Sequence, residues 1–296
     1  MVGQEVASST ELRDAVLRTL AYSDVFDYPL TAAEVHWALP LPATLAETEA
    51  ALRSLHELVG NEPPYFYLAG REGIVAIRER RQASSARLRR RARPWNRVIA
   101  ALPFVFSVIV TGSLAVDNAE MGEDVDYLIV SKPGRVWTAR AFTVAVVRLA
   151  RLTGVELCPN YVVAADALKM DKSAYVAREL AQMQPVSGIA VARRLLDENP
   201  WWRSYLPNAT PATLRSTSGP SSRLLQRLPE TLLGGRLGEA LERAILQWKA
   251  AQLRRDAGSN AEAVFDERMA KGHVEAHRSR IEAALAERFV RLGLQP

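Results

Sequence analysis

The stretch Val110-Thr111-Gly112-Ser113, followed ten residues later by Asp124-Val125-Asp126-Tyr127-Leu128-Ile129-Val130, decides how the chain is organised. One hydrophobic run stops at the Gly-Ser turn, and a second carries two carboxylates at its leading end. Side chains two apart on a strand point to the same face, so Asp124 and Asp126 can grip one metal-sized ion together. The stretch therefore predicts a strand, a tight turn, and a second strand with a carboxylate pair near that turn.

Regular elements alternate outward from this stretch. Hydrophobic periodicity predicts strands over 104–111, 124–131 and 156–164, and helices over 135–152, 173–183 and 189–198. The segment 117–123 is polar and acidic and reads as a surface loop. We expect an α+β protein whose central domain spans residues 86–207.

The N-terminal segment, residues 1–85, has the element order of a winged helix. Helical faces fall at 11–21, 32–39 and 45–58, and Thr31 with Glu34 forms a capping box for the second. Apolar runs at 65–68 and 74–77 predict a hairpin around Gly70–Gly73. The third helix is acidic and poorly suited to a phosphate-lined groove, which favours a structural or protein-contacting role over DNA reading.

The segment Arg78–Arg97 is the most basic part of the chain, with nine arginines and one acid. It reads either as a nucleic-acid or nucleotide-phosphate surface or as a connecting helix whose arginines meet acidic surfaces of the flanking domains. Pro94 predicts the start of a new short helix. Beyond the central domain we expect a linker at 208–222, poor in apolar residues, and a helical C-terminal region at 223–296.

The charge and cysteine content of the chain bear on its partners and its compartment. The net charge of +5 and pI of about 9.5 fit a phosphate-rich partner or a general bias toward arginine. A single cysteine, Cys158, forbids an internal disulfide, and the start of the chain has no apolar leader, so we expect a cytoplasmic protein. Pro103 and Gly112 interrupt the longest uncharged run, which argues for a buried strand and against a membrane span.

The acidic stretch predicts nucleotide chemistry. A glycine after a strand lets the backbone approach a phosphate, and successive N–H groups there bind anions. Magnesium prefers one or two carboxylates together with substrate phosphate oxygens. Gly112, Ser113, Asp124 and Asp126 therefore predict a site for Mg²⁺ and a nucleoside triphosphate such as ATP.

Gly-Ser and Asp-x-Asp at this spacing resemble the signature of the DNA polymerase β-like nucleotidyltransferase superfamily, over residues 104–164. The chain also resembles uncharacterised bacterial nucleotidyltransferase-domain proteins with a winged-helix N-terminus, through segments such as Leu157–Tyr161. The resemblance implies transfer of a nucleoside monophosphate from an NTP to an acceptor hydroxyl, with release of pyrophosphate. Asp124 and Asp126 would bind Mg²⁺, and Gly112 and Ser113 would hold the triphosphate.

A third carboxylate of the family is expected on the strand at 156–164. Glu156 is the only acid on the relevant face, and Asn160 is the alternative. An amide oxygen can ligate a metal but cannot take a proton or offset the metal's charge, so Asn160 in this place would weaken the case for two-metal catalysis.

Arg135 and Arg140 are further candidates to contact the triphosphate. The acceptor stays open between RNA, a protein and a small molecule, with nucleic acid reached through Arg78–Arg97. The competing reading is a catalytically weak regulator that senses nucleotide or binds DNA through its winged helix.

Overall fold

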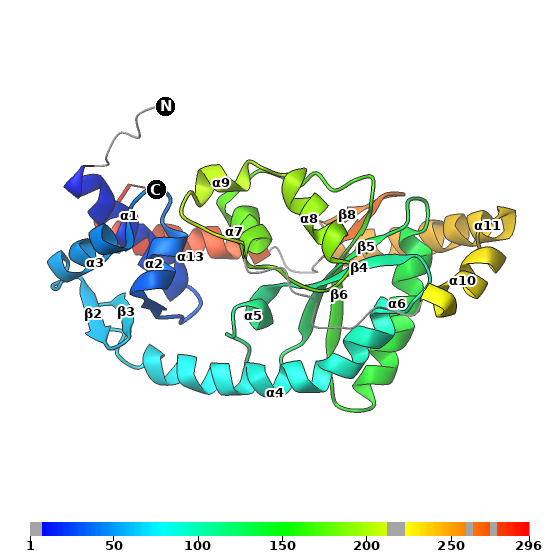
Figure 1. Ribbon diagram of the computed structural model, residues 1–296, viewed down its shortest axis with the longest axis horizontal. Helices are drawn as coiled ribbons and strands as arrows, with labels where there is room; N and C mark the ends of the chain where they lie inside the picture. Colours follow the sequence, from blue (N-terminus) through cyan, green and yellow to red (C-terminus); the bar gives the residue numbers. More distant parts are fainter. Residues whose placement is uncertain (1–7, 212–222, 259–262, 273–276, 296) are drawn as a thin grey trace.

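The computed structural model describes residues 8–211, 223–258, 263–272 and 277–295, which form a mixed α+β protein built on two sheets (Figure 1). The larger sheet has six strands in the order β7-β4-β5-β6-β9-β8. Its strands are β4 (Val105–Val110), β5 (Val125–Ser131), β6 (Leu157–Ala164), β7 (Gln184–Ser187), β8 (Val264–Phe265) and β9 (Met269–Lys271).

Helices cover both faces of this sheet. β4 and β5 are antiparallel, whereas β5 and β6 are parallel and joined by α6 (Val136–Arg151). One side of β5 packs in a core with α6, and the other packs with α7 (Ala174–Gln182), α8 (Ile189–Asp197) and α9 (Trp202–Tyr205). β5 is buried on both faces, which explains why its sequence after Asp126 is almost continuously apolar.

The N-terminal domain contains the predicted helices but a different hairpin. It consists of α1 (Ser9–Asp24), β1 (Leu30–Thr31), α2 (Ala32–Ala38), α3 (Leu45–Ser54), β2 (Val59–Glu62) and β3 (Tyr65–Leu68). The Thr31–Glu34 capping box is confirmed. The strand predicted at 74–77 is wrong, because that apolar run forms the first turn of a helix and β3 pairs with β1 and β2.

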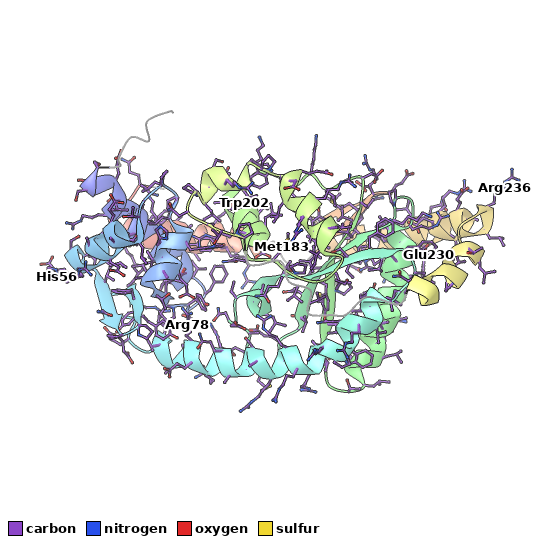
Figure 2. The ribbon with its side chains drawn as sticks, in the orientation of Figure 1. His56, Arg78, Met183, Trp202, Glu230 and Arg236 are labelled. Atoms are coloured by element: carbon purple, nitrogen blue, oxygen red, sulfur yellow. The ribbon has the colours of Figure 1, made fainter. Side chains whose placement is uncertain are left out.

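That helix, α4 (Ile74–Ala100), runs along the lower edge of the molecule from the N-terminal domain to the large sheet (Figure 1). It is one helix of 27 residues with Pro94 inside it, so the predicted new start at Pro94 is wrong. Arg78, labelled in Figure 2, is buried at the end of α4 that meets the N-terminal domain and pairs with Glu34. Arg81 pairs with Glu120.

The C-terminal residues do not gather in one place. Helices α10 (Arg223–Leu232), α11 (Arg236–Ile245) and α12 (Ala251–Ala257), with a π-helical turn over Leu246–Ala250, lie beside the core that contains α6, while β8 and β9 extend the sheet. The last helix, α13 (His277–Arg291), returns to pack on α1. Most of the predicted linker, residues 212–222, lies outside the described residues.

Among the described residues, no helix combines the length and apolar character that a bilayer span requires.

Candidate functional site

The Gly-Ser turn lies against the first residues of β5, where Asp126 is located. The backbone N–H of Thr111 donates to the carbonyl of Asp126 at 3.0 Å, which fixes the turn to the neighbouring strand. Gly112 has φ +64°, a left-handed conformation that favours glycine. A Cβ at Gly112 would overlap Asp126 Oδ2 and lie 3.3 Å from its Cγ. Only glycine therefore lets the turn come this close to the Asp126 carboxylate.

Three potential metal ligands converge beside this turn. Ligand atoms of Asp124, Asp126 and Cys158 all lie within 4.8 Å of one another. Asp126 and Cys158 are partners across the parallel β5–β6 pair, which explains why the thiol joins the carboxylates. Asp124 is exposed, whereas Asp126 and Cys158 are half-buried, so the cluster opens to solvent on the Asp124 side.

On β6, where the third carboxylate was expected, Asn160 is the residue that contacts Asp126. Its Nδ2 donates to Asp126 Oδ1, and its Oδ1 lies 2.7 Å from Cys158 Sγ. Glu156 lies outside the cluster, because its Oε2 accepts from Arg151 Nε at 3.0 Å. A bulge in the β5–β6 pairing after Asp126 accompanies this arrangement. The geometry thus favours Asn160 over Glu156 as the neighbour of the aspartates.

Two further carboxylates approach the donors of the turn. Ser113 Oγ donates to Glu123 Oε2 at 2.8 Å, and the N–H of Gly112 points to Glu179 Oε2 at 3.4 Å. The groups expected to hold a phosphate therefore face carboxylates in this structure. Glu179 was not predicted, since it lies on α7, more than 50 residues beyond Asp126, and nothing in its local pattern marks it.

This crowding of acids shifts pKa values. Burial, and then the charges of Asp124 and Glu179, raise the pKa of Asp126 to about 8. Burial also raises the pKa of Glu179 and, together with the two aspartates, that of the Cys158 thiol. Burial and mutual repulsion make it unfavourable for these carboxyl groups to ionise together, and a bound cation would stabilise their ionised forms. The site as a whole is therefore electrostatically suited to a divalent ion.

The two arginine candidates separate. Arg135 lies just before α6, at the far end of β5, where it donates to the carbonyls of Gly134 and Gly234. The seven residues of β5 place it roughly 20 Å from Asp124, too far to share a triphosphate with that side chain. Arg140 is the cation whose charge acts on Cys158, and burial lowers its pKa. Arg140 alone of this pair is near the cluster.

The donor set fits one magnesium ion. Mg²⁺ is commonly bound by one or two carboxylates of a protein together with phosphate oxygens of the substrate, and the Asp124 side of this cluster is open to solvent. A thiol and an amide in the third and fourth positions do not form a second magnesium site, since Mg²⁺ prefers oxygen and the amide brings no charge. A thiolate is instead a ligand for softer ions such as Zn²⁺.

Comparison with known proteins adds no relative: no family model matches the sequence, and neither a curated protein nor a solved structure matches the chain.

Proposed function

We propose that the protein is a nucleotidyltransferase of the DNA polymerase β-like type, which moves a nucleoside monophosphate from an NTP to an acceptor hydroxyl. The observation that carries the proposal is the convergence of Asp124 and Asp126 beside the Gly112 turn. A strand, a glycine turn and a second strand bearing two carboxylates are the parts that the resemblance requires. The six-stranded sheet, to which β4 and β5 belong, and its β5-α6-β6 unit are compatible with such a core.

In this proposal the two aspartates hold one Mg²⁺, which supplies charge neutralisation on the triphosphate oxygens. Gly112 and Ser113 turn their donors from Glu179 and Glu123 to the phosphates. The acceptor oxygen attacks the α-phosphorus, the bond to the bridging oxygen breaks, and pyrophosphate leaves. In this scheme Glu179, which lies at the Gly112 N–H and whose pKa burial raises, would take the acceptor's proton.

The test is label transfer from each α-labelled NTP with Mg²⁺ and cell extract. The wild type is compared with Asp124→Ala/Asp126→Ala and with a control that removes two exposed acids outside the site, Asp197→Ala/Glu267→Ala. We expect transfer by the wild type and the control and none by the first variant. If the wild type transfers no more label than Asp124→Ala/Asp126→Ala with every nucleotide, the proposal is refuted.

A second candidate is a protein that binds nucleotide without turning it over. It is favoured by Asn160, a neutral amide that donates a hydrogen bond to Asp126 on the strand where the resemblance calls for a third carboxylate. This candidate predicts saturable Mg²⁺–NTP binding that Asp126→Ala abolishes, with no label transferred to any acceptor.

A further inference from the structure

The outward side of α4 is a row of unpaired positive charge. Arginines that face inward are engaged: Arg89, for example, pairs with Asp117. The outward ones are exposed and form no ion pair or hydrogen bond with another described residue; they are Arg80, Arg87, Arg90, Arg93 and Arg97. In Figure 1 no described element lies below the left-hand part of α4, while the end of α6 and the loop after it reach below its right-hand end. This row spans roughly 26 Å at the rise of an α-helix.

An open hollow of about 470 Å³ interrupts this surface and is lined by Arg87, Arg90, Arg91 and Met121. Met121 is 57% exposed and stands three residues before Asp124. On the other side, Arg91 Nη2 donates to the carbonyls of Thr153 and Gly154, in the loop before β6. The hollow therefore lies beside the loops that precede β5 and β6, the two strands at whose first residues the acidic cluster lies.

We propose that this surface, from Arg80 to Arg97 with the hollow at Met121, binds the backbone of a single-stranded nucleic acid and directs its end toward Asp124 and Asp126. Exposed arginines without acidic partners match a chain of phosphates, which neutralise such charges with release of counterions. An exposed apolar side chain among them provides contact for a base. The identification of the bound strand as the acceptor rests on the function proposed above, whereas the binding itself is independent of that function.

The observations favour a single strand over a duplex. A duplex reader needs a helix that enters a groove, and the helix of the N-terminal domain in that position, α3, presents the exposed Glu47 and the half-buried Glu49. α4 instead presents charge along one side of a helix that is packed against both domains. A flexible strand can follow that side and bend at the Met121 loop, whereas a stiff duplex cannot.

The experiment measures the affinity of the full chain for a labelled 20-nucleotide RNA, a DNA of the same sequence, its duplex, and phosphatidylserine vesicles, from 50 to 200 mM NaCl. The variant is Arg87→Gln/Arg90→Gln. The control, Arg13→Gln/Arg193→Gln, removes the same charge from exposed positions on α1 and α8. Two lost phosphate contacts lower the slope of log Kd against log salt by about 1.4, so the variant's affinity should change about sevenfold less over this range.

We expect the single strands to bind more tightly than the duplex and the vesicles, and only the Arg87→Gln/Arg90→Gln variant to show the reduced salt dependence. Preference for vesicles or for the duplex, or an equal loss in the control, overturns the proposal. Asp124→Ala/Asp126→Ala should bind the strand as the wild type does. Failure of label transfer with this binding intact would count against the proposed function alone, and transfer without strand binding would count against this surface alone.

Discussion

Replacing Gly112 by alanine tests whether the turn and the carboxylate form one unit. The change carries two costs. A left-handed residue with a Cβ costs about 1–2 kcal/mol. The new methyl group also overlaps Asp126 Oδ2, so the carboxyl group must rotate and lose its hydrogen bond from Asn160. Because the pKa of Asp126 is about 8, this group is largely protonated at pH 7, and the bond is a neutral one worth about 0.5–1.5 kcal/mol. The expected loss in the free energy of unfolding at pH 7 is therefore about 1.5–3.5 kcal/mol.

Gly134→Ala is the matched control. Gly134 has φ +70°, close to the +64° of Gly112, but no atom lies within 4 Å of the position that a Cβ would take there. The Gly134→Ala substitution therefore introduces the backbone strain without the overlap. We would measure urea unfolding of both variants and Mn²⁺ binding by paramagnetic relaxation. At pH 7, Gly112→Ala should be the less stable by about 0.5–1.5 kcal/mol and should bind Mn²⁺ at least tenfold more weakly. Equal stability and equal Mn²⁺ affinity for the two variants would refute the reasoning.

Three other predictions can be checked with purified protein. The pKa of Asp126 rises from 3.8 in the unfolded chain to about 8, so its contribution to stability is present below pH 3.8 and is lost as pH rises through about 8; urea midpoints in EDTA should fall from pH 6 to pH 9, and less so in Asp126→Asn. Glu156→Gln should transfer label at nearly the wild-type rate and lose under about 1 kcal/mol of stability, since it breaks only an exposed ion pair with Arg151; a loss of transfer like that of Asp126→Asn would instead make Glu156 a ligand. Arg78→Ala should cost about 2–4 kcal/mol in urea unfolding, because Arg78 is 4% exposed, pairs with Glu34 and lies over the rings of Tyr28 and Tyr65. Arg80→Ala, at an exposed neighbouring position, is its control and should change stability by under about 0.5 kcal/mol.

The parts of the fold that follow from local pattern were predictable from the sequence. The strands and helix around Asp124 and Asp126 lie within a residue or two of their predicted bounds, because long apolar periods leave little choice of structure. The hairpin was misplaced for the opposite reason. The segment 74–77 is apolar but too short to distinguish a strand from a helical turn, whereas Val59–Glu62 is a strand with only one apolar residue.

Pairing over long distances could not be predicted. β7 contains Pro185 and stands at an edge of the sheet, where a proline is tolerated but a local pattern gives no strand signal. β8 and β9 are short and are recognised only by their pairing with β6. In the site, Asp124 and Asp126 were identified by spacing, but Glu179 and Cys158 join them only through tertiary packing.

The position of α13 has a consequence for how the chain folds during synthesis. Its Leu285 and Phe289 pack on the core of the N-terminal domain, and Arg288 binds Asp24, which also binds Arg71. Arg288 follows Asp24 by 264 residues. The N-terminal domain is synthesised before α13 and is therefore missing part of its core until α13 emerges from the ribosome, and contacts so distant in sequence form slowly. A nascent chain stopped before α13 should expose an apolar surface that chaperones recognise.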